Sequence, residues 1–424
     1  MKFTVRFAFL LLMVLVPRVG WMQEQSECVD QDIKDIFRSK DKKFEEPKIV
    51  IKKPSIILIP VIASSPATGF QLGVAGQAAW YNDAPEDTRI SQASANATVT
   101  AKGQVLITMK STVMGKHDKW IYTGDWRYYF YSQSTYGLGT NAPDSASLDY
   151  GINIGGVDAE ANPGEQPMDF RWLRLHETAL REVRDNLYVG LGYHLDIYQN
   201  IADLNLDVAN QKYTDHYLYS VQRGFDPVQY SISGLSLNVV YDSRDNQINP
   251  YRGFYVNGQY KFNSVGFGST RDSEMLWLEM RAYKNLSKGR PRHLLGVWTF
   301  AQSLAGGSAP YMTLPAANYD TRNRSARAYV QGRYRGEELV YGELEYRFPI
   351  SPCTGVLGGV LFVNGITTSN RETGAQVRVF DYVKAGYGFG LRIAADKLSR
   401  TNIAIDVGFG EKSMGIYFGA AEVF

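Results

Sequence analysis

The chain has 424 residues with a nearly balanced charge, 45 Lys and Arg against 43 Asp and Glu, which gives a formal net charge of +2. Because the two signs are interspersed, the charge pattern gives no support to a nucleic-acid-binding surface and fits a solvated interior of mixed sign. Tyr (28), Phe (20) and Gly (40) are abundant and Cys is nearly absent (2). Length alone does not divide the chain, since all-β barrels of this size form single domains.

The N-terminus has the layout of a secretory signal peptide. Lys2 and Arg6 precede the apolar run 7–16, which ends at Pro17. The run is too short to span a bilayer as a helix. Residues 1–22 are therefore predicted to be a signal peptide.

A charge-dense leader is predicted to follow over residues 23–63. It holds too few residues to build its own core, so we expect a periplasmic arm. Cys28 does not indicate a lipoprotein, because Gln25, Ser26 and Glu27 before it are polar where a lipobox is apolar and small.

The remainder, residues 64–424, alternates between apolar and polar side chains with a period of two, as in segments 187–197, 235–242 and 402–409. A soluble sandwich also alternates. However, segments of about 9 to 15 residues with aromatic residues near their ends are what tilted strands crossing a bilayer require. The sequence therefore predicts an all-β fold, a transmembrane antiparallel β-barrel in the outer membrane of a Gram-negative bacterium.

Sixteen strands are predicted, an even number as such barrels require. They cover residues 68–82, 91–101, 104–114, 119–132, 145–156, 168–183, 186–199, 229–243, 252–264, 272–286, 292–305, 338–350, 355–366, 379–395, 400–410 and 414–424. With a periplasmic N-terminus, the long connections 200–228 and 306–337 lie outside the cell and short turns lie in the periplasm. Leu237 and Ile405 are predicted to face lipid, whereas Asn238 and Asn402 face the lumen, where an arginine should cost little.

Three groups of residues resemble the bacterial surface antigen superfamily, the barrels of BamA/TamA type. The first is a strand-turn-strand signature with Asp242, Arg244, Asp245 and Gly253. The second is Arg327 to Arg335 with Glu343 to Phe348, and the third is Gly386 to Arg392 with the ending Gly415 to Phe424. The resemblance spans Pro66 to Phe424. It implies a sixth extracellular loop inserted into the lumen and a terminal Phe424 recognised by the barrel-assembly machinery.

The loop motif departs from the family in two places. The family has Arg-Gly-aromatic, whereas this chain has Arg327, Ala328 and Tyr329. The family also has Phe-x-Asp-x-Gly on the thirteenth strand, whereas Phe362 is followed here by Asn364 in place of the Asp. Arg327 therefore lacks its family partner.

Glu343 and Glu345, which share a strand face with Arg347, are the expected substitutes, because a guanidinium in a partly dry lumen needs a carboxylate. The sequence does not choose between the two. Glu345 and Arg347 also fit ordinary lumen charges, and Gly386, Gly388 and Gly390 fit a wall against which a loop packs closely. The Asp242 to Asp245 cluster fits a fixed turn.

Catalysis has little support. The five histidines are scattered, and His176 and His194 are possible cross-strand neighbours without a third metal ligand. No nucleophile elbow, zinc-protease motif or phosphate-binding loop occurs. We therefore predict no enzyme, no cofactor and no metal site, and rank an outer-membrane enzyme last of three classes.

The favoured class is a barrel for outer-membrane biogenesis that inserts or translocates a polymer, with the loop around Arg327 as a plug and the first and last strands as a weakly sealed seam. Its expected partners are outer-membrane lipid, the barrel-assembly machinery and a client polypeptide or lipid. The alternative is a passive, porin-like pore for small solutes, since sixteen strands enclose a wide lumen unless it is plugged. The sequence predicts none of the family's periplasmic POTRA domains, which weakens the insertase interpretation.

Cys28 and Cys353 are both predicted on the periplasmic side, which permits disulfides. A bond would tether the leader beneath the barrel, and two free thiols are the alternative, because the geometric window for bonding is narrow.

Overall fold

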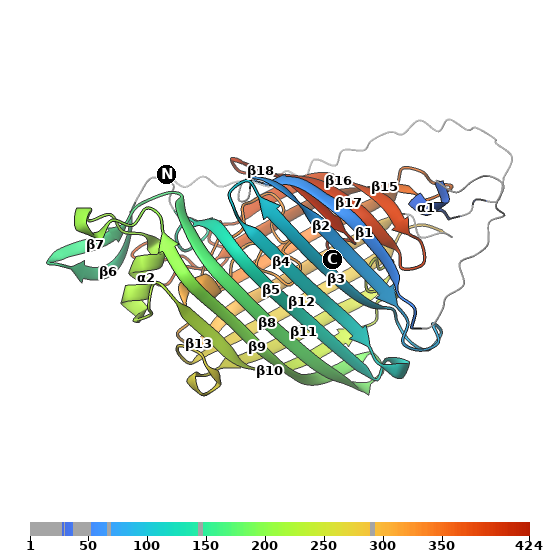
Figure 1. The fold of residues 1–424 in the computed structure, drawn as a ribbon, viewed down its shortest axis with the longest axis horizontal. Coiled ribbons are helices and arrows are strands. Elements are labelled where there is room, and N and C mark those ends of the chain that lie inside the picture. The colour runs from blue at the N-terminus through green and yellow to red at the C-terminus, as the bar shows by residue number, and fades with distance from the viewer. Residues whose placement is uncertain (1–27, 29, 37–51, 66–68, 143–146, 289–292) are drawn as a thin grey trace.

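The computed structural model of the chain describes residues 28, 30–36, 52–65, 69–142, 147–288 and 293–424. In this part of the chain, sixteen antiparallel strands form one continuous sheet that curls into a barrel (Figure 1). In hydrogen-bonding order the strands are β1 (Ser55–Ser65), β2 (Gly69–Trp80), β3 (Ser91–Thr100), β4 (Val105–Met114), β5 (Trp120–Thr135), β8 (Gln166–Arg184), β9 (Leu187–Asp203), β10 (Tyr230–Asp242), β11 (Gly253–Asn263), β12 (Ser273–Asn285), β13 (Leu294–Gly307), β14 (Glu338–Pro349), β15 (Leu357–Thr368), β16 (Lys384–Asp396), β17 (Thr401–Gly410) and β18 (Ser413–Ala420). The predicted all-β barrel of sixteen strands is confirmed. The predicted signal peptide lies outside the described residues.

The two ends of the barrel differ. At one end a cap is built by the hairpin β6 (Leu148–Ile154) and β7 (Val157–Ala161), helix α2 (Asp215–Arg223) and the start of the connection 308–337 (Figure 1). Short turns and helix α1 (Ile33–Ile36) occupy the other end. The remaining short elements are the 3-10 helices η1 (Lys116–Asp118), η2 (Val208–Asn210), η3 (Val265–Phe267) and η4 (Tyr311–Thr313).

No helix in the described ranges is both long and apolar enough to cross a membrane.

The period-two alternation gives the wall two different faces. On β10, Leu237 and Val239 are 55% and 49% exposed, whereas Ser236, Asn238 and Val240 between and beside them are buried. On this strand the outer face is therefore apolar, as contact with lipid requires, and the inner face carries polar groups.

Two strand predictions were wrong: one predicted barrel strand lies in the cap, and one barrel strand was not predicted. The total of sixteen barrel strands is therefore unchanged. Segment 145–156 forms β6, which pairs only with β7 in the cap. The true first strand is β1, which pairs with β2 along its whole length, although these residues were predicted to belong to the leader, which was expected to end at residue 63. Pro60 in β1 reads as a strand breaker, but it is tolerated because β1 is an edge strand of the ladder, where the missing N–H breaks no ladder bond. The barrel accordingly begins at Ser55.

This shift reverses the direction expected for the four strands predicted between residues 68 and 132. From β8 onward the order matches the prediction, because β1 replaces the misassigned fifth strand. The long loops therefore still share one end of the barrel, the end opposite α1.

The lumen asparagines are also more constrained than expected. Asn238 is 2% exposed, donates to Ser236 Oγ (2.8 Å) and accepts from Gln259 Nε2 (2.8 Å). Asn402 donates to Glu422 Oε1 (2.7 Å). An arginine at either position would break these bonds, so we now expect a larger cost there than the small one predicted from the sequence.

A disulfide joins Cys28 to Cys353, so of the two alternatives left open the structure contains the bond, with 4.9 Å between the Cα atoms. Cys353 lies in the short turn between β14 and β15. Next to it, Gln31 N donates to Thr354 O (2.9 Å) and Lys397 Nζ donates to Asp35 (2.9 Å). The bond thus fastens α1 to the turns at the end of the barrel away from the cap.

We predict that Cys353→Ser releases α1 from the barrel end. A helix of four residues has no stability of its own, so amide exchange over residues 30–36 should quicken by about tenfold or more while exchange in β14 and β15 stays unchanged. Hydrogen exchange with mass spectrometry measures both. Asp35→Asn, which removes one ion pair and keeps the disulfide, is the matched control. Non-reduced peptides of the wild-type protein that show only free thiols would contradict the tether.

The cap contains a buried carboxyl group. Asp215, 2% exposed, accepts hydrogen bonds from Tyr150 Oη (2.8 Å) and Gln166 Nε2 (2.7 Å). Burial raises the pKa of the Asp215 carboxyl from 3.8 to about 6. The two hydrogen bonds oppose the rise, and the charge of Asp203 adds to it.

The raised pKa predicts a cap that loosens as the pH rises. The stabilising contribution of the protonated group is complete below the unfolded-state pKa near 3.8 and is lost as the pH passes through about 6. By the linkage relation the loss amounts to roughly 3 kcal/mol. Amide exchange of residues 148–161 and 215–223, corrected for intrinsic rates, should be slower at pH 5 than at pH 7.5. Asp215→Asn should abolish that difference, and an equal difference in this variant would assign the effect to another group.

Candidate functional site

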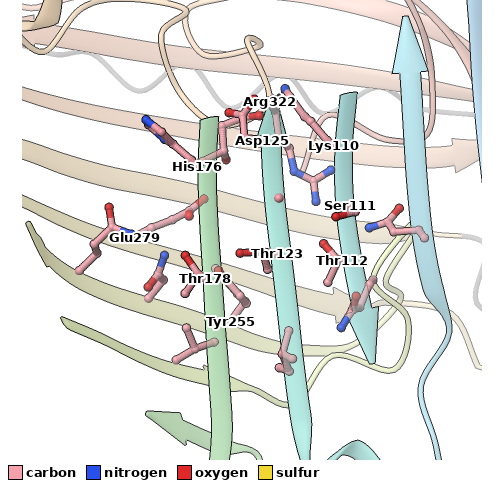
Figure 2. Close-up of a pocket in the computed structure, with 18 of the residues that line it drawn as sticks. Lys110, Ser111, Thr112, Thr123, Asp125, His176, Thr178, Tyr255, Glu279 and Arg322 are labelled. Carbon is pink, nitrogen blue, oxygen red and sulfur yellow. Dashed lines mark hydrogen bonds between the residues drawn. The ribbon is translucent and has the colours of Figure 1, made fainter. Parts of the chain in front are cut away.

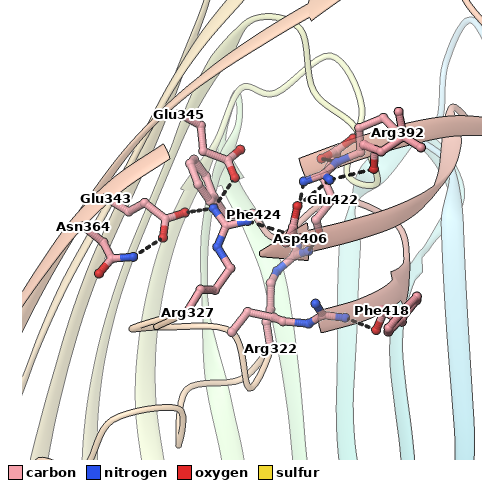
Figure 3. A network of polar contacts seen from close by, with 12 residues as sticks. Arg322, Arg327, Glu343, Glu345, Asn364, Arg392, Asp406, Phe418, Glu422 and Phe424 are labelled. Atoms are coloured by element: carbon pink, nitrogen blue, oxygen red, sulfur yellow. Dashed lines mark hydrogen bonds and ion pairs between the residues drawn. The ribbon is translucent and has the colours of Figure 1, made fainter. Parts of the chain in front are cut away.

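The connection 308–337 between β13 and β14 carries Arg327 to a site on the inner face of the wall (Figure 3). Arg327 is fully buried, and its guanidinium donates to Glu343 (2.5 Å), Glu345 (2.5 Å) and Asp406 (2.9 Å). Glu343 and Glu345 belong to β14 and Asp406 to β17, so one arginine ties the loop to two strands that are not neighbours in the sheet.

Each of these carboxylates has a further partner. Glu343 accepts from Tyr341 Oη (2.5 Å), Glu345 from Arg347 Nε (2.9 Å), and Asp406 from Arg392 Nη1 (2.6 Å). Both oxygens of each buried acid are thus hydrogen-bonded, which favours a defined geometry for buried ion pairs. The network fixes the position of the loop.

The substituted Asn364 does not contact Arg327. Its Nδ2 donates to Glu343 (3.3 Å), and the guanidinium carbon of Arg327 lies 3.7 Å from the centre of the Phe362 ring. Tyr329 donates from its hydroxyl to Ala385 O (2.6 Å) on β16. The residues predicted for the loop and its wall are therefore brought together.

Glycines allow the loop to lie directly on β16 and β17. A Cβ on Gly408 would stand 1.6 Å from the carbonyl oxygen of Arg327, and one on Gly386 would stand 3.0 Å from the Cβ of Ala328. Of the glycines singled out from the sequence, Gly388 instead faces the Phe362 ring and Gly390 the Asp406 carboxylate. Gly408 and Asp406 were missed. The only feature of the sequence that could have indicated Gly408 and Asp406 was their position, a glycine and an acid on the inner face of β17, whose other face is apolar.

The loop also reaches the opposite wall. Arg127 of β5 donates to Asn323 Oδ1 (2.6 Å), and Gln133 of the same strand donates to Gln331 O (2.9 Å). Since β5 lies far from β14 and β17 in the sheet order, contacts on both sides mean that the loop crosses between them.

The edge strands of the sheet are β1 and β18. They contact each other, but no ladder joins them in the part of the chain that the structure describes. Beyond β18, residues 421–424 turn away from the wall. Glu422 accepts from Arg392 Nε (2.7 Å), and Phe424, 1% exposed, packs on Trp298 and Tyr283.

A search with protein-family descriptions matched residues 176–422 to the Omp85 superfamily domain. The match covers more than half of the chain. The chain belongs to the Omp85 superfamily. This membership places it in the Gram-negative outer membrane as a barrel that is not an enzyme, in a family whose role is insertion or translocation.

The fold of this Omp85 barrel is similar to that of a solved structure. The BamA structure from Haemophilus ducreyi lacking POTRA domains 1–3 is similar over 87% of this chain and 69% of that chain, with a TM-score of 0.50 and 13% identity. CdiB from Acinetobacter baumannii is similar over 87% of this chain and 65% of that chain, with a TM-score of 0.48 and 11% identity. No curated protein matches the sequence. No POTRA-like region is evident among the described residues.

The turn signature of this Omp85 chain has a structural role. Arg244 makes two bonds to Asp242 (2.9 Å each), and Asp245 Oδ1 accepts from the backbone N–H of Tyr251 (2.9 Å). Gly253 has a φ of 106° and lies so close to Ser243 O that a Cβ would stand 2.3 Å away. These contacts close the turn between β10 and β11.

The histidine pair is likewise held by its own neighbours. The rings of His176 and His194 lie 4.5 Å apart. His176 bonds to Asp196 (2.8 Å) and His194 to Ser236 (2.8 Å). No group of three metal-binding side chains occurs in the described ranges.

Proposed function

We propose that this Omp85 barrel inserts or translocates a polymer across or into the outer membrane. In this proposal the loop 308–337 is a plug, and β1 and β18 are the two sides of a seam that opens. The observation that carries this proposal is the combination of a firmly anchored loop and two edge strands that no hydrogen-bonded ladder joins among the described residues. Arg327 secures the loop with three carboxylates, whereas β1 and β18 touch without a ladder among the described residues.

The seam supports this role because an edge strand offers unpaired N–H and C=O groups to another extended chain. The inward turn of residues 421–424 shortens β18 to eight residues against eleven in β1. Because β18 is shorter than β1, part of the β1 edge has no residue of β18 opposite it. Such an edge suits recognition by added β-strands.

A conductance experiment separates this function from a passive pore. Deletion of residues 308–336 should convert a protein with little steady conductance in planar bilayers into one with large, stable openings. A wild-type protein that already conducts as well as the deletion variant would favour the porin-like alternative instead.

Site-specific cross-linking tests the seam. Leu58 of β1 and Leu237 of β10 both face outward, at 72% and 55% exposure, but only Leu58 belongs to an edge strand. A photoreactive phenylalanine analogue at position 58 should capture a nascent outer-membrane polypeptide, and the same analogue at position 237 should not. Equal capture at both positions would count against a seam.

A further inference from the structure

A cavity of about 390 Å³ lies at the seam. Its walls include residues of both edge strands, whose side chains alternate between the outer and inner faces: Ile59, Pro60 and Val61 of β1 and Ile416, Tyr417 and Phe418 of β18. Pro60 and Phe418 are exposed on the outer face, whereas Tyr417 faces inward. The cavity therefore lies where the two edge strands meet.

Three cations stand at the inner end of this cavity: Lys110 of β4, and Arg322 and Arg324 of the loop. Unlike Arg327, none of them forms an ion pair with a carboxylate of the described residues. Lys110 donates to Thr321 O, Arg322 to Glu422 O (3.4 Å) and Arg324 to Phe418 O (2.6 Å). The Nη1 atom of Arg324 is buried without a hydrogen-bond partner among the described residues.

The neighbouring acids among the described residues are bonded to other groups, and none of them forms an ion pair with these three cations. Asp125 is bonded by Arg127 (2.8 Å), Glu422 by Arg392 (2.7 Å), and Asp320 accepts from the backbone N–H of Arg322 (2.7 Å) and of Ser325 (2.8 Å). Asp125 and Asp320 therefore offset only part of the positive charge that Lys110, Arg322 and Arg324 gather in this partly buried space, and the remaining excess is costly. An anion bound among them would remove that cost.

A second cavity, of about 400 Å³, shares the same three cations and is lined on its far side by threonines of β4, β5 and β8 (Figure 2). Lys110 and Arg322 lie at one end of that cavity beside Asp125. The cations thus lie between a polar cavity and one whose walls include apolar side chains of the two edge strands. A ligand that meets both environments is an amphiphile with an anionic head.

We propose that the seam cavity binds the phosphate headgroup of an anionic lipid. Lys110, Arg322 and Arg324 hold the phosphate, and the acyl chains leave between β1 and β18. Free phosphate offers the same charge, but it would leave the apolar side chains of the edge strands without a partner. The inference rests on the proposed function in one respect, namely that the seam admits a ligand from the bilayer.

Native mass spectrometry of the full-length protein tests the site with phosphatidylglycerol, phosphatidylcholine and inorganic phosphate as probes. The wild-type protein should retain phosphatidylglycerol at least about tenfold better than phosphatidylcholine. The triple variant Lys110→Gln, Arg322→Gln, Arg324→Gln should lose that preference, and Lys110→Arg should keep it. The matched control is Lys212→Gln, Arg252→Gln, Arg378→Gln, which removes the same charge from exposed positions and should retain the preference.

Three results would overturn the lipid site. They are equal retention of both lipids by the wild-type protein, an equal loss in the exposed-residue control, and inorganic phosphate binding as tightly as the lipid. Heat-modifiable migration shows whether each variant is folded. Cross-linking from position 58 is scored in the triple variant as well. If the wild-type protein shows no lipid preference but still captures the client, only the lipid site fails. If the wild-type protein captures no client, the proposed insertion function fails, whatever the lipid result. Capture that persists in the triple variant after its lipid preference is lost shows that the two functions are separable.

Discussion

Arg327→Ala should loosen the plug and lower the heat resistance of the folded barrel. The substitution leaves Glu343, Glu345 and Asp406 buried with one cation fewer, and breaking a buried pair by removing one partner costs about 3–5 kcal/mol. We expect the folded band on semi-native gels to convert at a lower temperature, and cells carrying the variant to admit large antibiotics. Both are measured against the wild-type protein at equal expression.

Arg378→Ala is the matched control, because Arg378 is an exposed arginine in the connection 369–383. Adding Glu343→Gln to Arg327→Ala should restore part of the loss, since a neutral amide can still accept from Tyr341 and no longer repels Glu345. Unchanged gel mobility and unchanged leak in Arg327→Ala would show that the arginine does not anchor the loop.

The barrel was largely predictable from sequence, because a strand between lipid and a polar lumen must alternate. The apolar outer face and polar inner face of β10, β9 and β17 are visible in the sequence for this reason. Alternation does not say which sheet a strand joins. Segment 148–154 alternates because it packs on the small core of the cap, and β1 was missed because Pro60 resembles a breaker.

The site was predictable in part. Glu343 and Glu345 were the expected partners of Arg327 because a guanidinium in a partly dry lumen needs a carboxylate, and Arg327 is hydrogen-bonded to both in the structure. Asp406 could not be assigned, since its contact depends on how far the loop crosses the lumen, which no local pattern encodes. The inward turn of Phe424 was equally invisible. Its burial means that recognition of this residue during assembly, which remains a prediction, would have to precede folding.

Leu237→Arg should strongly destabilise the barrel in a lipid bilayer. Leu237 lies near the middle of β10 with its side chain on the outer face, 55% exposed. An arginine facing lipid at mid-membrane costs about 2–4 kcal/mol. Unfolding by urea or guanidinium from vesicles of defined lipid gives the free energy directly. Ile405→Arg on the outer face of β17 should behave in the same way.

The control for Leu237→Arg must be an arginine substitution on the lumen face, and the structure changes which residue is suitable for it. Asn238 and Asn402 are held by hydrogen bonds, so Thr123 of β5 is the better control, because its side chain lines the 400 Å³ cavity beside Thr112 and Thr178. An arginine there can extend into a polar space, although it adds a further positive charge near Lys110. We therefore expect Thr123→Arg to cost clearly less than Leu237→Arg. Equal costs at the two positions would mean that the two faces of the wall do not differ in environment, which is incompatible with a barrel that meets lipid outside and polar side chains within.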